Sequence, residues 1–517
     1  MNAVSHLLLL ASVVVTLGQI APQSDSSPHQ STDAARGGQL ARIHCQTCHL
    51  FPEPHLLEKK TWINGALPRM APFLGAANIN FENRPDGKIL KEANIFPPAP
   101  LLSESDWRAI NHFYHLHGEE PERPRTQRKI DQSLTLFDPH PLPYPGSSHV
   151  ASLVRIDSGK SRVFIGNAGR PSLDLASLSG ELLSRVELES PPVDMAVRPE
   201  GIYLTLIGNL FPSDERKEKL VLVTSVEGVR PMVRTLIDKL ARPTSTLFAE
   251  LNGDGLEDVV VCSFGNYLGR LSWFQKSANA AYREHVLFER PGAVNAVLTL
   301  NSKAQGPEFV VLMAQAREGI YRFRRNREGR FSSDAIAEFH PAFGASNLSV
   351  ADFNKDGYPD LLLTNGDNGD YPSRPKTYHG IRIFMNDGNG GYREQWFYPL
   401  NGAFKAIARD FDLDGDLDIA AISFFPDYEN SPEQSFVYLQ NAGDIEFTAA
   451  TFGGALAGRW LTMDAGDMDG DGDDDVVLGS FAEGPLSVPI PSALQRSWRT
   501  NGFSVLCLEN KRRKLKL

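Results

Sequence analysis

Apolar residues follow two different periods along this chain of 517 residues. In the segments 34–44 and 103–117 they recur at helical spacing, with polar residues on the remaining positions. After a charged, Pro-rich linker at 119–128, short apolar runs typical of strands replace them. The pattern predicts a multidomain α + all-β protein, with a small helical domain at 35–118 and an all-β domain at 129–517.

The helix expected at 103–117 has recognisable start and stop signals. Ser103 stands at the predicted N-cap and Asp106 follows three residues later, as in a capping box. Gly118 follows the last periodic residue and is typical of a helix end. The boundaries of this helix are therefore predicted independently of its apolar spacing.

The strands of the all-β domain repeat with a long period. When the apolar strand that opens each repeat is used as a ruler, successive starts lie about 43 to 59 residues apart, which suits four-stranded propeller blades. The period predicts a seven-bladed β-propeller. The predicted starts lie near His149, Pro192, Pro243, Ala293, Ala345, Phe404 and Trp460.

The last repeat is one strand short. Its apolar segment at 505–510 is followed by a basic tail, so nothing downstream can supply an outer strand. We expect the segment 133–137 to supply that strand from the N-terminal side, which would close the ring and remove an exposed edge.

The N-terminus carries an apolar run at 7–18 that is too short to span a bilayer but suits a signal peptide. Residues 1–21 are therefore expected to be cleaved, residues 22–34 to form a flexible linker, and the protein to be exported to the periplasm or cell surface. An uncleaved anchor is the alternative. No second long apolar run occurs, so we expect no integral membrane segment in the mature chain.

The charge composition of the chain bears on which class of molecule it can bind. The chain has 52 basic and 63 acidic residues and a net charge of −11, which disfavours nucleic acid as a partner. The hydrophobic and charged fractions, 41% and 22%, are ordinary for a folded soluble domain.

Only four cysteines occur, and two of them form a CxxCH motif at 45–49. This spacing is typical of c-type haem attachment, in which two thiols bind the haem covalently and the following imidazole ligates the iron. Cys45, Cys48 and His49 are assigned these roles, for one covalent haem c. A thioredoxin-like redox CxxC is the alternative, but the βαβ context it requires is missing. Cys262 and Cys507 lie in apolar strands and are expected to be free, buried thiols.

The motif and its two flanking helices resemble a class I cytochrome c domain over 35–118. In that family a Met on a loop after a Pro is the sixth iron ligand, which implies Met70, after Pro68. The competing candidates are the histidines His55, His112, His115 and His117.

Four loops of the all-β domain share one spacing of oxygen-bearing side chains, at positions 1, 3, 5 and 9, with Gly at position 6. Crowding several carboxylates into one turn is unfavourable unless a cation neutralises them, and Ca²⁺ accepts six to eight such oxygen ligands. Up to four calcium ions are therefore expected. The candidate ligands are Glu250, Asn252, Asp254 and Asp258; Asp352, Asn354, Asp356 and Asp360; Asp410, Asp412, Asp414 and Asp418; and Asp467, Asp469, Asp471 and Asp475.

These loops are not EF-hands, because position 12 holds an apolar strand residue instead of Glu. They resemble the calcium loops of FG-GAP and VCBS repeats, and the whole arrangement resembles exported bacterial proteins that join a cytochrome c to such repeats. The alternative is a set of polar hairpin turns without metal.

Three functions remain open at this point. The first is periplasmic electron transfer by the haem, with the propeller docking a redox partner or a polysaccharide. The second is a propeller dehydrogenase, for example a quinone-dependent one, that uses the haem as electron acceptor; the third is a carbohydrate-binding or adhesion module. A long polar loop at 364–371, with Lys376, Tyr378 and His379, is the best candidate for a ligand site, together with Asp427 and Tyr428. No catalytic residue is assigned.

Overall fold

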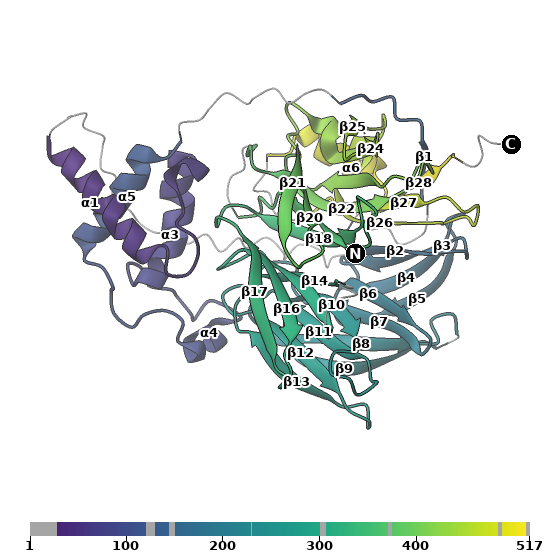
Figure 1. Ribbon diagram of the computed structural model, residues 1–517, viewed down its shortest axis with the longest axis horizontal. Coiled ribbons are helices and arrows are strands. Elements are labelled where there is room, and N and C mark those ends of the chain that lie inside the picture. The colour runs from purple at the N-terminus through teal and green to yellow at the C-terminus, as the bar shows by residue number, and fades with distance from the viewer. Residues whose placement is uncertain are drawn as a thin grey trace, which may run out of the picture.

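The computed structural model describes residues 28–119, 130–143, 150–228, 230–299, 307–370, 375–483 and 489–512. The predicted signal peptide, the linker at 120–128 and most of the basic tail lie outside these residues. A group of helices lies beside a ring of sheets (Figure 1). The two predicted domains are thus both present, and no helix of the described residues is long and apolar enough to cross a membrane.

The ring is a seven-bladed β-propeller made of four-stranded antiparallel sheets. Blades 1 to 3 are β2 (Ala151–Asp157), β3 (Arg162–Asn167), β4 (Ser172–Ser177), β5 (Leu182–Glu187); β6 (Pro192–Arg198), β7 (Gly201–Leu206), β8 (Arg216–Thr224), β9 (Met232–Ala241); and β10 (Pro243–Ala249), β11 (Asp258–Ser263), β12 (Arg270–Lys276), β13 (Tyr282–Phe288). Blades 4 and 5 are β14 (Ala293–Leu298), β15 (Glu308–Met313), β16 (Gly319–Arg325), β17 (Phe331–Glu338); and β18 (Ala345–Ala351), β19 (Asp360–Asn365), β20 (Gly380–Asn386), β21 (Tyr392–Pro399). Blades 6 and 7 are β22 (Ala403–Arg409), β23 (Asp418–Ser423), β24 (Phe436–Asn441), β25 (Phe447–Ala450); and β26 (Trp460–Gly466), β27 (Asp475–Ser480), β28 (Val505–Asn510), β1 (Phe137–Pro141).

The innermost strands begin within two residues of the starts predicted from the repeat period. The seven-bladed prediction is therefore confirmed. Short helices interrupt the last blades, namely η4 (Pro432–Ser435), η5 (Ala455–Ala457) and α6 (Ser492–Asn501).

The ring closes through a strand from the N-terminal side, as predicted, but not through the predicted residues. β1 pairs antiparallel with β28, with Phe137 opposite Asn510. The segment 133–137 contributes only Phe137, because Leu134 donates its backbone N–H to Thr451 of blade 6 instead (3.1 Å). Leu134 and Leu136 pack against the core between blades 6 and 7, so their apolar character serves that core rather than the sheet.

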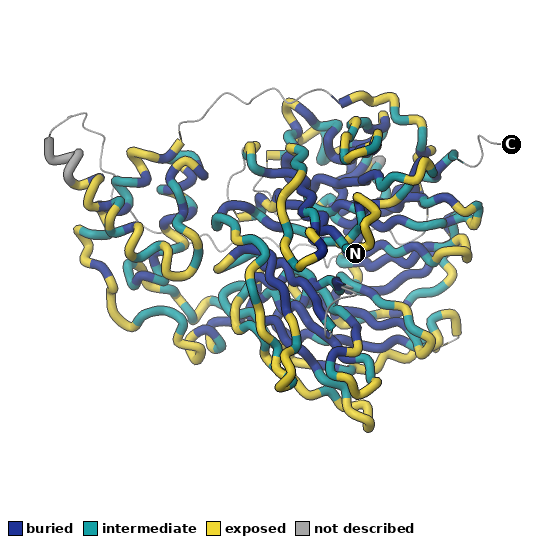
Figure 2. Tube along the Cα trace, in the orientation of Figure 1, coloured by how far each residue is buried: buried dark blue, intermediate teal, exposed yellow. Residues whose placement is uncertain are grey.

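The second strand of a blade such as β11 is buried at every residue, and the strand interiors are the darkest parts of Figure 2. Its side chains face the two neighbouring blades alternately, with the two-residue period of a strand. In β11, Val259 and Val261 pack toward blade 2, whereas Val260 and Cys262 pack toward blade 4. Each such side chain contributes about 1.5–3 kcal/mol when fully buried. Cys262 and Cys507 are free and buried in separate clusters, which confirms the prediction for both thiols.

The helical domain is built on two packed helices, α1 (Pro28–His44) and α5 (Glu104–His117). A Cβ on Gly37 would lie 2.0 Å from the carbonyl oxygen of Ala109, so this crossing requires glycine. The α5 start is as predicted, because Ser103 Oγ accepts the N–H of Asp106 (3.1 Å). α1 begins earlier than residue 34, with a Pro in its first turn, where its missing N–H is tolerated. The short elements between them are η1 (Pro54–Leu56), α2 (Lys59–Thr61), η2 (Trp62–Ala66), α3 (Leu67–Met70), η3 (Ala71–Leu74) and α4 (Gly87–Ala93).

Specific contacts join the two domains. Tyr378 donates its hydroxyl hydrogen to the Leu56 carbonyl (3.1 Å). The backbone N–H of Asp214 is donated to Asp86 Oδ2 (3.2 Å), and the buried Asp214 carboxylate in turn accepts three N–H groups of the loop at 266–268. The helical domain is therefore held against one end of the propeller by hydrogen bonds that involve buried backbone.

Candidate functional site

A cavity of about 2410 Å³ lies between the helical domain and the propeller. One wall is formed by the CxxCH segment and by α3, and the other by the propeller. All seven innermost strands contribute to the propeller wall, so the cavity continues into the central channel of the ring. One lining residue from each innermost strand, in chain order, is Arg155, Asp194, Thr244, Asn295, Asn347, Lys405 and Asp464.

The CxxCH residues lie together on the helical wall. α1 ends at His44, and the backbone N–H of Cys45 continues the helical turn by bonding to Ala41 (2.7 Å). Cys45 and Cys48 are both free thiols that line the cavity. Burial raises the pKa of Cys45 to about 11, so its thiol is protonated at neutral pH.

His49 also lines the cavity, and its Nδ1 lies 2.7 Å from the Leu50 carbonyl oxygen. This contact favours the tautomer with hydrogen on Nδ1, which leaves the lone pair on Nε2. Burial lowers the pKa of His49, with the Leu50 hydrogen bond opposing it. The imidazole is therefore held neutral, in the form that can ligate a metal.

Met70 ends α3 and lines the same cavity, among the apolar residues Leu67, Leu74 and Trp107. The competing histidines His55, His112, His115 and His117 do not line it. Tyr114 closes the base of the apolar wall: it is fully buried and donates its hydroxyl hydrogen to the Pro52 carbonyl (2.9 Å). Two thiols, a neutral imidazole and a thioether around an apolar cavity form the donor set that a c-type haem uses, so these residues fit that group.

Each acidic loop joins the first strand of its blade to the second, at the end of the propeller opposite the β19–β20 loop. In two loops the carboxylates converge: oxygens of Asp410, Asp412 and Asp414, and of Asp467, Asp469 and Asp475, lie within 4.8 Å of one another. Asp410 Oδ1 and Asp471 Oδ2 are buried and accept no hydrogen bond from the described residues. Buried oxygens of this kind are costly without a partner, and a cation would supply one.

The other two loops differ because Asn occupies position 3. Asn252 donates its amide N–H to Asp254 (2.9 Å), and Asn354 donates to Asp356 in the same way (2.9 Å). These amides already occupy carboxylate oxygens that a cation would need. Among the described residues, no three-carboxylate group forms in either loop.

The aspartate at position 9 has a structural role that the spacing alone did not reveal. Asp475 accepts the N–H groups of Met468 (2.8 Å) and Asn510 (2.7 Å), which ties its loop to β28. The corresponding Asp418 accepts the N–H of Asn441 (2.8 Å) and the hydroxyl of Tyr438 (2.7 Å). Each of these carboxylates therefore fixes the first loop of its blade to the third strand.

The polar loop at 364–371 faces the helical domain. Asp370 forms an ion pair with Arg69 (3.0 Å), and Asp367 lines the cavity, whereas Tyr371 lies outside the described residues. The two candidates of blade 6 have structural roles. Asp427 caps the turn at 428–430, and Tyr428 is buried beside Trp498.

Comparison with known protein families matches an FG-GAP-like repeat to residues 307–363 and 410–478. The chain contains FG-GAP-like repeats. The matched segments include three of the four acidic loops, at 352–360, 410–418 and 467–475. No curated protein matches the chain.

Two solved structures share 12% sequence identity with this chain. A protein from Lactobacillus plantarum has a TM-score of 0.38 and covers 57% of this chain and 82% of its own. A Saccharomyces cerevisiae structure, described as a variant of Dbp5 bound to Nup159, a variant of Gle1, IP6 and ADP, has a TM-score of 0.39 and covers 74% and 97%.

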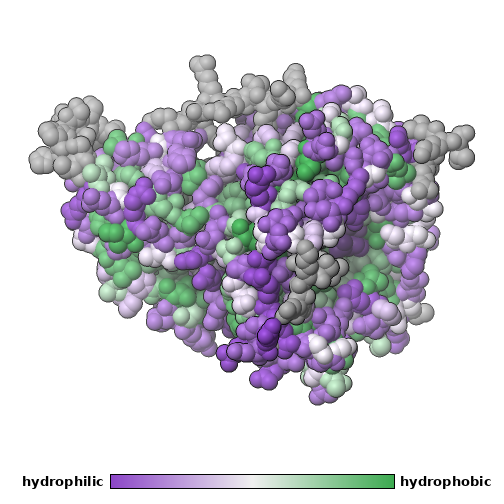
Figure 3. Space-filling model, viewed as in Figure 1, coloured by the Kyte–Doolittle hydropathy of each residue, from purple (hydrophilic) through white to green (hydrophobic). Residues whose placement is uncertain are grey.

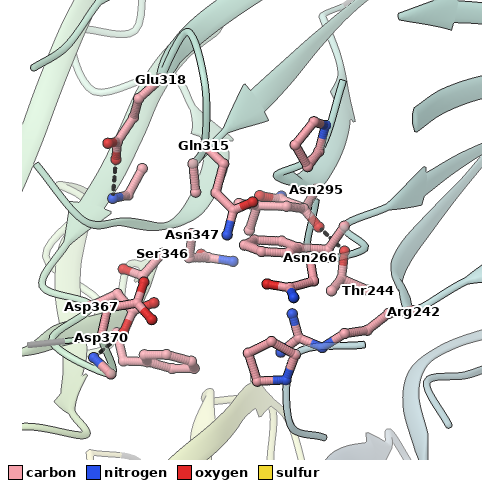
Figure 4. A pocket seen from close by; sticks show the side chains of 18 of the residues that line it. Arg242, Thr244, Asn266, Asn295, Gln315, Glu318, Ser346, Asn347, Asp367 and Asp370 are labelled. Atoms are coloured by element: carbon pink, nitrogen blue, oxygen red, sulfur yellow. Dashed lines mark hydrogen bonds between the residues drawn. The ribbon is translucent and has the colours of Figure 1, made fainter. Parts of the chain in front are cut away.

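Around the mouth of the propeller lie charged residues that sequence reasoning missed. Arg242 precedes β10 and Glu318 precedes β16, and both line the cavity (Figure 4). Glu318 is buried and accepts the N–H of Ala345 (2.7 Å), and burial raises its pKa to about 8. Burial likewise lowers the pKa of Lys376, which the sequence had placed with the candidate polar loop, to about 8. No spacing pattern along the chain marks Arg242 or Glu318, because only the closed ring brings them together.

Proposed function

We propose that this protein is an exported monohaem c-type cytochrome that transfers electrons in the periplasm, with its β-propeller as the binding platform for a redox partner or a polysaccharide. The observation that carries the proposal is the convergence of Cys45, Cys48, His49 and Met70 on one apolar cavity. These residues come from two segments about 20 residues apart, and the haem-attachment spacing alone did not require Met70 to lie there.

Each residue has a defined role in holding the haem. The Cys45 and Cys48 thiols would hold the haem through two thioether bonds, and His49 Nε2 and the Met70 sulfur would serve as its iron ligands. The Leu50 carbonyl keeps the His49 ring in the ligating tautomer (2.7 Å). When bound, the haem supplies one-electron redox chemistry, and the apolar wall excludes water from it.

The cavity favours a second candidate, in which the propeller is a dehydrogenase that passes electrons to the haem. The observation in its favour is that the CxxCH wall and the propeller channel belong to one continuous cavity. A molecule bound at the channel mouth would contact both domains, because Met70 and Asp367 line the same space.

Calcium binding completes the proposal. Asp410, Asp412 and Asp414 in blade 6, and Asp467, Asp469 and Asp475 in blade 7, are the strongest candidates, since their oxygens converge. The loops at 250–258 and 352–360 would be weaker sites, because an Asn amide donates to a carboxylate in each. Neutralising these loops would stabilise the propeller end that lies away from the haem.

A pyridine haemochrome assay on protein produced in a strain that matures c-type cytochromes tests the proposal. We expect one haem per chain that resists acid extraction, and none in Cys45→Ser/Cys48→Ser. Met70→Ala should abolish the methionine-to-iron charge-transfer band while leaving the haem attached. Protein that lacks haem in such a strain, or that loses it to acid, would overturn the assignment.

A further inference from the structure

Arg242 is an unusual cation at the propeller mouth. Its Nη1 and Nη2 donate to the carbonyls of Gly265 (3.3 Å) and Leu210 (3.0 Å), but its Nε is buried without a partner. No carboxylate of the described residues lies within ion-pair distance of it, whereas Arg155 elsewhere in the channel pairs with Asp464 (3.2 Å). A desolvated guanidinium without a counter-ion is unfavourable, and an anionic ligand would remove that cost.

Asp367 lies on the opposite side of the same space (Figure 4). Its Oδ1 accepts only the N–H of Gly369 (2.8 Å), and no cation of the described residues forms an ion pair with it. Although much of its side chain is accessible, the accessible surface faces the cavity. Arg242 and Asp367 both line this cavity and form no ion pair with each other, so a ligand bound there meets both charges.

Three amides complete the site: the side chains of Asn266, Gln315 and Asn347 point into the space between Arg242 and Asp367 (Figure 4). None of them makes a side-chain hydrogen bond to a described residue. Asn295, by contrast, joins two blades by donating to the Leu348 carbonyl (2.7 Å). Each unengaged amide offers a donor and an acceptor, which is the pairing that a hydroxyl group needs.

The cavity is also large enough for a second molecule beside a haem. Its volume of about 2410 Å³ exceeds the ~300–1,000 Å³ of ordinary ligand pockets by more than twofold. Cys45, Cys48 and Met70 line the helical side of the cavity, whereas Arg242, Asp367 and the three amides line the propeller side. The two ends of the cavity therefore suit two different occupants.

We propose that the propeller mouth binds a polyhydroxylated carboxylate of monosaccharide size, a uronic acid, with its carboxylate at Arg242 and its hydroxyls at Asp367 and the three amides. The site rests on the proposed function only in so far as the propeller is a binding platform, because none of its residues is assigned to the haem. This proposal narrows the ligand of the propeller from an unspecified glycan to an acidic sugar.

Isothermal titration calorimetry of the full-length holoprotein tests the site with D-galacturonate and D-glucuronate. D-Galactose carries the hydroxyls without the carboxylate, and acetate carries the carboxylate without the hydroxyls. We expect at least one uronate to bind, galactose to bind at least about tenfold more weakly, and acetate to give no signal.

Variants locate the binding. Arg242→Gln and Asp367→Asn should each weaken uronate binding at least about tenfold, since each removes a charge-assisted contact. Asn347→Ala should weaken it by a few fold without disturbing the fold, because the Asn347 amide makes no hydrogen bond to any residue that the structure describes. Arg324→Gln is the matched control: Arg324 pairs with Asp334 on the exposed side of blade 4 and should leave binding unchanged.

Three results would overturn the site: no uronate binding, equal binding of galactose, or uronate binding that Arg242→Gln leaves intact. If Arg242→Gln instead shifts the haem absorption bands without affecting uronate, the guanidinium holds a haem propionate and the site is wrong. The haemochrome assay separates the two proposals, because haem without uronate binding refutes only this site, and uronate binding without haem refutes only the cytochrome.

Discussion

The two domains bury their apolar residues in different ways. In the propeller, alternate residues of each strand pack between neighbouring blades, so every blade is supported on both sides. In the helical domain, much of the apolar surface faces a cavity, and four large hydrophobic side chains are exposed, namely those of Ile43, Leu50, Leu101 and Leu116. Hydrophobic surface is visible over this domain in Figure 3. We therefore expect the propeller to fold on its own contacts, and the helical domain to be stabilised further by what fills its cavity.

Blocking the proposed haem attachment should produce the largest difference in response between the helical domain and the propeller. We expect Cys45→Ser/Cys48→Ser to abolish hydrogen-exchange protection in α1 and α5, because their shared core borders the cavity in which we propose that the haem binds. Protection in the propeller strands should not change. The control is Cys262→Ala, a buried thiol of blade 3, which should lower propeller stability by about 1 kcal/mol and leave the helices protected. Unchanged protection of α1 in the double serine variant would show that the helical core is self-sufficient.

Calcium removal should act on the propeller and spare the helices. A site saturated at about 100 times its Kd contributes about 2.7 kcal/mol, so chelation should lower the propeller Tm by several degrees. Asp410→Asn should remove the contribution of the blade 6 site and Asp467→Asn that of the blade 7 site, since each belongs to one converging carboxylate group. Glu250→Gln, in a loop without such a group, is the matched control and should change little. A Tm that is the same with and without chelator would mean that the loops are hairpin turns only.

The pH dependence of the free energy of unfolding should reveal the buried carboxyl of Glu318, which lines the cavity between the two domains. Burial raises the pKa of Glu318 from 4.5 to about 8, so the folded state keeps a proton that the unfolded state has lost. This stabilisation is complete below the unfolded pKa and is lost as the pH rises through about 8. Glu318→Gln should therefore gain more than about 1 kcal/mol relative to the native protein between pH 5 and pH 9. Urea unfolding at both pH values checks this, with the exposed Glu328→Gln as a control that should show no such gain.

The smallest effect is expected at the hydrogen bond between the domains. Tyr378→Phe removes the bond to Leu56, which should cost about 1 kcal/mol of docking and increase hydrogen exchange at 54–57. Tyr392→Phe is the control, because the Tyr392 hydroxyl bonds within blade 5 to Asn386 (3.1 Å). Equal effects of the two variants on the helical domain would show that Tyr378 does not hold it.

The features that the sequence predicted correctly are those that depend on residues close together in the chain. The blade starts, the N-cap at Ser103 and the free thiols depend on neighbours in the chain, and all were predicted. The closing strand was displaced because Leu134 and Leu136 have an apolar partner core that no local pattern reveals. The four acidic loops look alike in spacing, yet whether their carboxylates converge depends on the side chain at position 3.

The candidate site at the propeller mouth could not be predicted in full, because its residues are distant in sequence and meet only in the folded ring. Arg242, Asn266, Gln315, Asn347 and Asp367 come from three blades and span more than a hundred residues. Asp367 lies in the polar loop at 364–371 that the sequence marked, but Arg242 and the three amides stand in no motif. Only the closed ring shows that they face one space, which is why the site required the structure.

Mass spectrometry of tryptic peptides from the oxidised, denatured protein tests the assignment of the haem most directly. Cleavage after Arg42 and Lys59 yields the peptide 43–59, which contains Cys45, Cys48 and His49. We predict that this peptide carries one haem, attached to both cysteines, and that neither thiol reacts with an alkylating reagent. Recovery of the unmodified peptide with two alkylated cysteines, from protein made where c-type cytochromes mature, would contradict the assignment.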